Sequence, residues 1–328
     1  KGLSFFSKQI KRTPSLFEQK KLITFYGGEP LLNYIVLQKL LVKIDKLKKT
    51  NELPENTRLS IVTNGSLITP DIAKFLRDYN VSVGVSVDGD EFSTNCNRKF
   101  INSDPAYSSI KKGIEICKRE NVNLSLSVTL SEACLRNPQN VIYALINEHQ
   151  VKSLGFNMLL TDKKYTVESD YFYKVSKFII DAFQEFRKKN IYEDRILRKV
   201  KAFFESEVYP FDCGASGGRQ IVIAPDGQIG ICHGFLNDRK YFMTNVNDLE
   251  FDPQKSKTYI EWNKRTPLNM PECQDCVALG ICGGGCPMNA YSNNHSIWAL
   301  DERFCVHAKM TLEWLIWELY TNIRKTNS

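Results

Sequence analysis

The segment LITFYGGEP, residues 22–30, places a short apolar run directly before two glycines, an acid and a proline. An apolar run of this length that ends in a turn signal is typical of a β-strand, here Leu22–Tyr26. The amphipathic stretch that follows at 31–50 predicts a helix. This segment therefore predicts a strand, a glycine turn and a helix in that order.

The same order recurs through the first 160 residues. Further strands, each apolar enough to be buried on both faces, are predicted at Leu59–Thr63, Val81–Val87, Leu124–Leu130 and Leu154–Leu160. Helices are predicted at 70–79, 105–120 and 138–149, and Thr69-Pro70 and Asp104-Pro105 are starting signals for the first two. This alternation predicts an α/β fold with a parallel sheet or barrel. A helix predicted at 3–20 precedes the first strand, so we expect one further strand upstream.

The pattern changes after residue 160. Residues 168–207 predict one or two polar helices, and Pro225-Asp226-Gly227 joins two short β-like runs, which predicts a hairpin over 221–232. The chain ends in a predicted helix with one apolar face, formed by Leu312, Leu315, Ile316 and Leu319.

The composition is that of a soluble enzyme, with 42% hydrophobic and 25% charged residues among 328. No apolar run approaches the roughly 18 residues of a membrane span, and no secretion signal is present, so we expect a cytoplasmic protein without membrane contact. The net charge of +7 comes from scattered basic residues, which favours solvated helix surfaces. An acidic peptide partner is an alternative, and no nucleic-acid-binding motif is recognisable.

Seven of the ten cysteines fall in the last third of the chain, at positions 213, 232, 273, 276, 282, 286 and 305. Sites with four thiolates favour zinc or iron–sulfur clusters. One zinc ion would use four of these thiols, whereas two clusters would use all seven if one cluster has an open position. The three glycines between Cys282 and Cys286 let the backbone wrap closely around a cofactor. Zinc and purely structural thiols stay open as alternatives.

Three further motifs follow predicted strands: Gly27-Gly28-Glu29-Pro30, Thr63-Asn64-Gly65 and Ser86-Val87-Asp88-Gly89. Together with the seven cysteines, in this order, they resemble radical S-adenosylmethionine (radical SAM) enzymes that carry a C-terminal SPASM domain. The resemblance implies a partial (β/α)6 TIM-like barrel over 1–165, a helical bridge over 166–210, and a small cysteine-rich SPASM domain with a β-hairpin and a C-terminal helix over 211–328.

The resemblance also implies a binding site for S-adenosylmethionine. The first motif, which includes Pro30, would hold the methionyl amine through Glu29, with Thr63, Asn64 and Asp88 nearby. Ser86 and, more weakly, Ser127 would contact the ribose, and Leu159 would pack on the adenine. For each residue a structural role as turn, cap or core is the alternative.

The resemblance divides the cysteines between two auxiliary [4Fe–4S] clusters. One would be held by the four outer thiols, Cys273, Cys276, Cys282 and Cys305. The other would be held by the three inner thiols, Cys213, Cys232 and Cys286, with one iron left open to bind substrate.

The CxxxCxxC loop that defines radical SAM enzymes is missing from the sequence. Cys282 and Cys286 have its first spacing, but Asn289 stands at the third position. We expect that this loop, the first strand and a third [4Fe–4S] cluster belong to a segment outside this chain. The alternative is a degenerate relative that cannot make radicals.

The function implied is maturation of a ribosomally made precursor peptide. A 5′-deoxyadenosyl radical would abstract hydrogen, and a thioether or carbon–carbon crosslink would form, with a flavodoxin or ferredoxin as electron donor. His233 follows Cys232 where sulfatase-maturating relatives carry an aspartate base, and it could move a proton. Formylglycine formation on a sulfatase and a non-catalytic iron–sulfur or zinc protein that binds peptides are the alternatives.

Overall fold

The computed structural model describes residues 1–12 and 21–326, which form two compact units. The sheet unit comprises Ser7–Leu159 and Ala182–Asp194, and the cysteine unit comprises Lys1–Phe6, Leu160–Asp181 and Arg195–Ser328. The residues that we predicted as a separate bridge, 166–210, are shared between both units. They are shared because residues 192–193 form a strand that pairs with the sheet.

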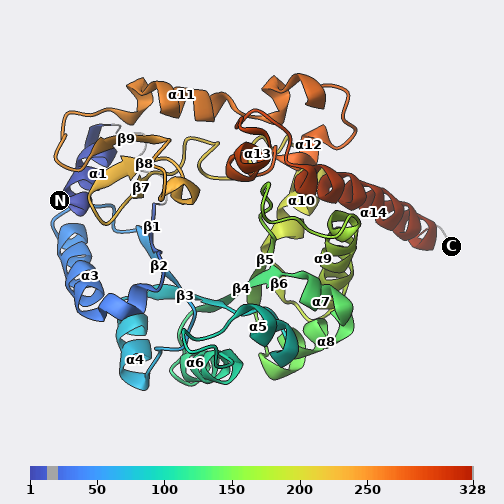
Figure 1. Cartoon of the computed structure of the whole chain (residues 1–328), viewed down its shortest axis with the longest axis horizontal. Coiled ribbons are helices and arrows are strands. Elements are labelled where there is room, and N and C mark those ends of the chain that lie inside the picture. Colours follow the sequence, from blue (N-terminus) through green and yellow to red (C-terminus); the bar gives the residue numbers. More distant parts are fainter. Residues whose placement is uncertain (13–20, 327–328) are drawn as a thin grey trace. The chain divides into compact units, whose positions relative to one another are not determined.

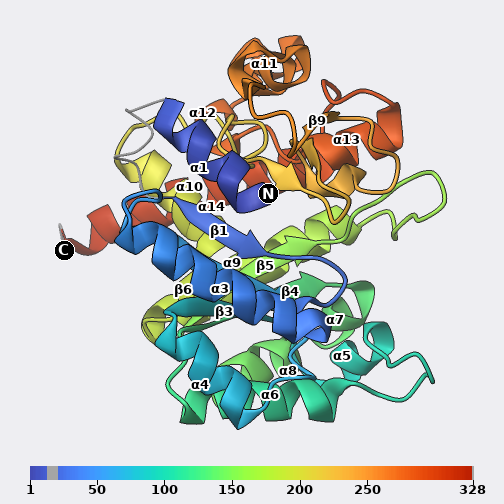
Figure 2. The same cartoon turned by 90° about the vertical axis from the view of Figure 1, so that its left-hand side faces the viewer.

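The core of the sheet unit is one parallel sheet of six strands in chain order. The strands are β1 (Leu22–Phe25), β2 (Arg58–Thr63), β3 (Val81–Ser86), β4 (Leu124–Leu130), β5 (Ser153–Met158) and β6 (Tyr192–Glu193). All five predicted strands are present, and β6 is additional. In Figure 2, β1 lies at the edge of the sheet with helix α3 (Tyr34–Lys49) beside it. Among the described residues β1 and β6 do not pair with each other, so the sheet is open there and forms no closed barrel.

Helices connect successive strands, as parallel pairing requires. After the short 3₁₀ turn η1 (Pro30–Asn33), the helices of this unit are α3, α4 (Pro70–Asp78), α5 (Glu91–Asn97), α6 (Tyr107–Arg119), α7 (Glu132–Arg136), α8 (Pro138–Tyr143) and the π-helical turn η2 (Ala144–Glu148). Figure 1 shows α3, α4 and α6 along one face of the sheet. The predicted helices at 31–50, 70–79, 105–120 and 138–149 all correspond to elements of this set.

Two predicted helix starts differ in outcome. Thr69 caps α4 as predicted, because its Oγ1 accepts a hydrogen bond from the Ile72 backbone at 3.3 Å and Pro70 occupies the first turn. The Asp104-Pro105 prediction was wrong, since α6 begins at Tyr107 without a side-chain cap. Pro105 instead forms an isolated β-bridge with Lys99.

The strands are buried on one face only, which corrects the prediction of burial on both faces. Apolar residues of β2, β3 and β4 alternate strictly with half-exposed ones. The half-exposed positions carry small polar side chains, among them Ser60, Ser82, Ser86, Ser125 and Ser127. One face of the sheet therefore packs under the helices, and the other presents hydroxyl groups.

The cysteine unit combines a small antiparallel sheet with short helices. Its strands are β7 (Val222–Ile223), β8 (Gln228–Gly230) and β9 (Phe242–Asn245), and the Asp226-Gly227 turn joins the first two as predicted. Its helical elements are α10 (Asp194–Phe204), η3 (His233–Phe235), η4 (Pro253–Lys255), α11 (Lys257–Lys264), η5 (Pro267–Asn269), η6 (Pro271–Cys273), α12 (Leu279–Cys282), α13 (Pro287–Asn294) and α14 (Glu302–Thr326).

Three further helices, α1, α9 and α14, compare with the predictions as follows. Helix α1 is described over Gly2–Arg12, and the remainder of the predicted helix at 3–20 lies outside the described residues. Helix α9 (Tyr171–Lys188) forms as predicted and contains the boundary between the units. On α14, Leu315 is buried with α10 and α12, whereas Ile316 is 52% exposed, so the predicted apolar face is only partly covered. In the described part of the chain, no helix is both long and apolar enough to cross a membrane.

A close backbone contact gives a test of the sheet unit. A Cβ atom added to Gly113 on α6 would lie 2.2 Å from the carbonyl oxygen of Gly65. That oxygen belongs to the backbone, so the clash could be relieved only by a backbone shift. We expect Gly113→Ala to lower the free energy of unfolding by about 1–3 kcal/mol in urea titrations, as overpacking does. The exposed Glu115→Ala on the same helix is the matched control and should change stability by less than about 0.5 kcal/mol. Equal effects of the two substitutions would contradict the contact.

Candidate functional site

The carboxylate of Glu29 joins the end of β1 to the end of β2. Its Oε1 accepts hydrogen bonds from the Leu31 backbone at 3.0 Å and from Thr63 Oγ1 at 2.7 Å, and its Oε2 accepts one from the Asn64 backbone at 2.7 Å. An ionised carboxylate offers about four acceptor positions. Three are used by the protein, so one remains for an ammonium group of a ligand. Pro30 follows at the first position of η1 and fixes this turn.

The two glycines before Glu29 border open space. A Cβ atom added to Gly27 or Gly28 would meet no atom within 4 Å, and both residues are exposed. Protein packing therefore does not demand glycine at Gly28, whose backbone conformation any residue can adopt. A ligand that approaches the backbone closely would demand it.

Two further predicted residues share a face of the sheet. Ser86 at the end of β3 stands beside Ser127 of β4 in the strand register, and both are half-exposed. Asn157 of β5 donates a hydrogen bond to Ser127 Oγ at 3.1 Å. Leu159, half-buried, follows the end of β5. The hydroxyl groups of Ser86 and Ser127 thus lie where a ligand along the carboxyl ends of the strands would meet them.

For Asp88, predicted as a cofactor-binding residue, the structure favours the structural alternative. The side chain is 1% exposed, and its Oδ1 accepts from Arg98 at 2.8 Å and from the Thr129 backbone at 3.3 Å. Burial raises the pKa of Asp88, and Arg98 acts against that rise. The carboxylate ties the β3 turn to the end of β4 and does not face a ligand.

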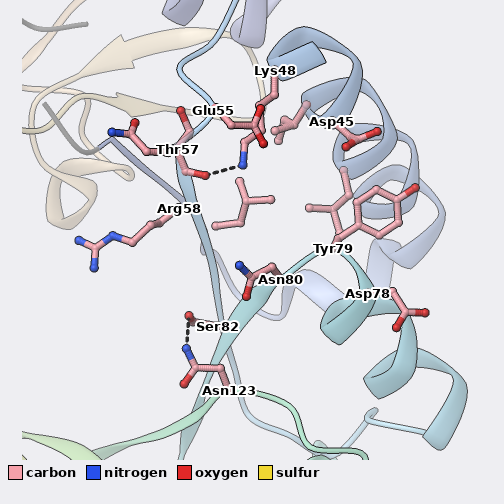
Figure 3. A pocket seen from close by; sticks show the side chains of 14 residues that line it. Asp45, Lys48, Glu55, Thr57, Arg58, Asp78, Tyr79, Asn80, Ser82 and Asn123 are labelled. Atoms are coloured by element: carbon pink, nitrogen blue, oxygen red, sulfur yellow. Dashed lines mark hydrogen bonds between the residues drawn. The ribbon is translucent and has the colours of Figure 1, made fainter. Parts of the chain in front are cut away.

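One cavity that borders the sheet lies at the opposite strand ends. It has a volume of about 560 Å³, and Arg58, Asn80 and Asn123 line it at the amino ends of β2, β3 and β4. In Figure 3, Lys48 donates a hydrogen bond to the Thr57 carbonyl in its wall, at 2.6 Å. Active sites of βα barrels lie at the carboxyl ends of the strands, and the residues predicted to bind the cofactor stand at those ends, opposite this cavity.

The three inner thiols act on one another electrostatically. Burial raises the pKa of Cys232 to about 12, and the charges of Cys286 and Cys213 add to that rise. Ser216, three residues after Cys213, is buried, and its Oγ has no hydrogen-bond partner among the described residues. His233 follows Cys232 with an exposed side chain, and partial desolvation lowers its pKa.

The four outer thiols form a second such group. Burial raises the pKa of Cys305 to about 12, with further contributions from Cys282, Cys273 and Cys276. A thiol with so high a pKa is protonated at neutral pH, and a positive metal centre would be needed to deprotonate it. Within the described ranges, no group of three or more His, Cys, Asp or Glu residues converges on a single metal ion.

A glycine loop connects the outer group to the inner one. Gly283, Gly284 and Gly285 have φ values of 73°, 78° and 69°, all left-handed. A Cβ atom at Gly283 would lie 2.6 Å from the Asp212 backbone nitrogen, and one at Gly285 would lie 2.9 Å from Asp301. Only glycine fits at these positions without strain. The three glycines therefore let the backbone between Cys282 and Cys286 pack closely against neighbouring residues.

A buried ion pair holds the far side of this loop. Asp301 accepts from the Cys286 backbone at 3.0 Å and binds Arg303 at 2.7 Å, and its backbone carbonyl accepts from the Cys305 backbone at 3.1 Å. Asn289, at the position where a third cysteine of CxxxCxxC would stand, donates to Asp301 at 3.2 Å. Asp301 therefore links an inner cysteine to an outer one.

Sequence reasoning missed the buried charges of this unit. Besides Asp301 and Arg303, the side chains of Arg265 and Lys199 are fully buried. Basic residues are normally assigned to solvent, and nothing in their sequence spacing marks these four as buried. The proximity of Asp301 and Arg303 to Cys305 was the one available signal.

The geometry agrees with comparisons to known proteins. The family model described as the radical SAM superfamily matches residues 8–131. This segment of the chain is therefore similar to a radical SAM domain. Members of this superfamily use S-adenosylmethionine and a [4Fe–4S] cluster, and several solved structures similar to this chain contain bound AdoMet. The matched segment ends within the sheet unit, just after β4.

Two relatives of the chain are named as enzymes of different kinds. The radical SAM cyclopropyl synthase TigE of Paramaledivibacter caminithermalis is 28% identical over 96% of this chain. The chain spans 64% of the length of that relative. A cysteine-type anaerobic sulfatase-maturating enzyme of Clostridium perfringens is 26% identical over 84% of this chain and 76% of its own length.

Two solved structures share the fold. Native anSMEcpe with bound AdoMet and Kp18Cys peptide has a TM-score of 0.78 at 22% identity, covering 98% of this chain and 90% of that one. Streptococcus suis SuiB bound to S-adenosylmethionine has a TM-score of 0.60 at 16% identity, covering 92% and 70%. These likenesses confirm the α/β fold predicted from the sequence.

The glycine loop supplies a test of the cysteine unit. We expect Gly283→Ala to lower the free energy of unfolding by about 2 kcal/mol or more, because the new Cβ meets backbone in a left-handed conformation. Gly280→Ala is the matched control three residues earlier, where an added Cβ meets nothing within 4 Å. It should leave stability unchanged or raise it by up to about 1 kcal/mol in α12. Urea unfolding of both variants decides, and a Gly283→Ala protein as stable as the Gly280→Ala protein would contradict the loop geometry.

Proposed function

We propose that this protein is a radical SAM maturase with a SPASM-like cysteine domain, which crosslinks a ribosomally made precursor peptide. The observation that carries the proposal is the co-occurrence of two arrangements. The sheet unit presents Glu29, Ser86 and two open glycines at the carboxyl ends of its first strands. In the cysteine unit, the charges of Cys286 and Cys213 act on Cys232, and those of Cys282, Cys273 and Cys276 act on Cys305, which supports one group of three thiols and one of four.

The residues of the sheet unit fit S-adenosylmethionine. The remaining acceptor position of Glu29 suits the methionyl ammonium group, while Thr63 and the Asn64 backbone hold the carboxylate in place. The open space beside Gly27 and Gly28 would accommodate the methionyl group of the ligand. Ser86 and Ser127 offer hydroxyl groups to the ribose, and Leu159 offers apolar surface to the adenine.

The thiols fit two auxiliary [4Fe–4S] clusters. Cys273, Cys276, Cys282 and Cys305 supply the four ligands of one, and the inner thiols supply three ligands of the other. When bound, S-adenosylmethionine supplies the radical that removes a hydrogen from the peptide, and the clusters accept the second electron or ligate a substrate atom. The glycine loop connects Cys282 of the outer group to Cys286 of the inner group, and Asp301 accepts a hydrogen bond from the Cys286 backbone. These contacts would fix the positions of the two thiols relative to each other.

His233 is the residue of this chain that we assign to proton movement. It lies beside Cys232 with an exposed side chain, and desolvation favours its neutral form, which accepts a proton. Crosslinking removes two hydrogens from the peptide, one as an atom and one as a proton plus an electron. His233 would take that proton, and the electron would return to an external donor such as a flavodoxin or ferredoxin.

Formylglycine formation on a sulfatase is a second candidate, favoured by the likeness to sulfatase-maturating enzymes. The residue after Cys232 argues against this candidate. It is His233 in this chain, whereas the family resemblance implies an aspartate at that position in sulfatase-maturating enzymes.

Mass spectrometry after anaerobic turnover separates the two functions. The experiment uses the full-length protein with a CxxxCxxC loop, reconstituted with iron and sulfide. We expect the precursor peptide to lose about 2 Da, to resist fragmentation between the linked residues, and to give no hydrazide adduct. A sulfatase peptide that instead gains a hydrazide-reactive aldehyde would support the second candidate. Protein that contains zinc and no iron after anaerobic purification would contradict both.

Gly28→Ala separates binding from folding. Because an added Cβ meets open space, the free energy of unfolding should change by less than about 0.5 kcal/mol. The Cβ would occupy the room that the methionyl group needs, so we expect S-adenosylmethionine affinity, measured by calorimetry on reconstituted protein, to fall about tenfold or more. Leu32→Ala, at a neighbouring residue with 78% of its side chain exposed, is the control and should change neither quantity. Undiminished affinity in Gly28→Ala would remove the first motif from the binding site.

A further inference from the structure

The cysteine unit contains a buried guanidinium without a carboxylate partner. Arg265 is fully buried, and its three hydrogen bonds go to backbone carbonyls: Nη1 to Gly284 at 2.8 Å, Nη2 to Ala299 at 3.1 Å, and Nε to Ile297. Among the residues that the structure describes, no carboxylate accepts a hydrogen bond from it. A guanidinium stays charged when buried, and an uncompensated buried charge is costly. Negative charge near Arg265 would therefore stabilise the folded unit.

Its position identifies where that negative charge belongs. Gly284 is the central residue of the loop that joins Cys282, an outer thiol, to Cys286, an inner one. Burial lowers the pKa of Arg265, and four nearby groups act in the opposite direction: Asp301, Cys286, Cys213 and Cys273. Asp301 is already paired with Arg303 at 2.7 Å. What remains are thiols of both groups, so Arg265 is shared between them.

A second buried basic side chain, Lys199, is acted on by two negative groups, Asp212 and the outer thiol Cys282, which oppose the lowering of its pKa by burial. Lys199 of α10 is fully buried, and its Nζ donates to the carbonyls of Ile281 at 3.0 Å and Cys282 at 3.2 Å. His307 on α14 is also fully buried, and burial together with Lys199 and Arg195 keeps it neutral by lowering its pKa. The positive charge on this side is therefore that of Lys199 and the nearby arginines.

We propose that Arg265 is the counter-cation shared by the two auxiliary clusters, that Lys199 serves the outer cluster only, and that these two cations set the reduction potentials of the clusters. This inference rests on the proposed function, since it requires clusters on these thiols. A reduced cluster carries one more negative charge than an oxidised one, and a buried cation stabilises that charge strongly at low dielectric. Net charge and hydrogen bonding around a cluster are among the factors that fix its potential.

The placement matches the role of the clusters in the reaction. Removal of the second electron from the peptide radical requires an acceptor whose potential is high enough to take it. Two cations buried beside the thiols raise that potential without contacting the substrate. Both residues are thus positioning residues for electron transfer, with no covalent role.

The test is a potentiometric titration of the reconstituted full-length protein with dithionite, monitored by electron paramagnetic resonance. Signals are assigned to the inner and outer clusters by their loss in Cys213→Ser and Cys276→Ser, respectively. We expect Lys199→Met to shift the one-electron reduction equilibrium of the outer cluster at least tenfold toward the oxidised form, which is 59 mV, and to leave the inner cluster unchanged. Arg265→Met should shift both clusters in the same direction, and Arg265→Lys, which keeps the charge, should shift neither by that much.

Controls distinguish the possible failures. Lys257→Met, at an exposed lysine of α11, should leave both potentials unchanged. Iron and sulfide absent from the parent protein would overturn the proposed function itself. Normal iron and sulfide with an unshifted outer potential in Lys199→Met would overturn this inference alone. If Arg265→Met does not fold, the Lys199→Met result decides, together with whether the inner cluster stays unshifted in that variant.

Discussion

Three consecutive glycines in left-handed conformation are the constraint on which the cysteine unit depends. They bring Cys282 of the outer thiols and Cys286 of the inner thiols to the two ends of one tight loop. Because the loop has no side chains, its backbone carbonyl at Gly284 is free to accept from Arg265, and its far end is free to pack on Asp301. The contacts that relate the two groups of thiols, including the buried cation between them, follow from this loop.

The sheet unit depends on an analogous backbone constraint. Parallel strands end at one edge, so motifs that are separated by about 30 residues in sequence meet there. Glu29 shows this directly, since its carboxylate reaches from the end of β1 to the end of β2. The carboxylate thereby fixes the geometry of the turn before any ligand binds. Preorganisation of this kind reduces the entropy lost on binding.

The sequence predicted much of the fold because its signals were local. The five longer strands and the four helices of the sheet unit follow from apolar runs and turn residues, and the hairpin follows from Asp226-Gly227. The short strand β6 was missed because two residues give no periodicity, and one of them, Glu193, is charged yet fully buried. Burial on both strand faces was a wrong expectation, although the alternating serines of β3 and β4 already carried the correct signal.

The candidate site likewise contains residues that local sequence signals predicted and residues that they did not. Cysteine spacing and the glycine motifs are local signals, and among the residues that they mark the structure joins Glu29 to Thr63 and Asn64. The burial of Asp88 was not foreseen because its partner Arg98 directly follows α5, a helix that the sequence did not predict.

Buried charge explains why the remaining residues were invisible to sequence reasoning. Arg265, Lys199 and Asp301 look like ordinary surface residues, since a charged side chain carries no mark of whether it will be desolvated. Burial of such groups opposes folding unless opposite charge or hydrogen bonds compensate them. Asp301 and Arg303 compensate each other at 2.7 Å, whereas Arg265 has backbone carbonyls alone among the described residues. An anionic cofactor on the surrounding thiols would complete that compensation, so the metal content of this unit and its stability are expected to be coupled.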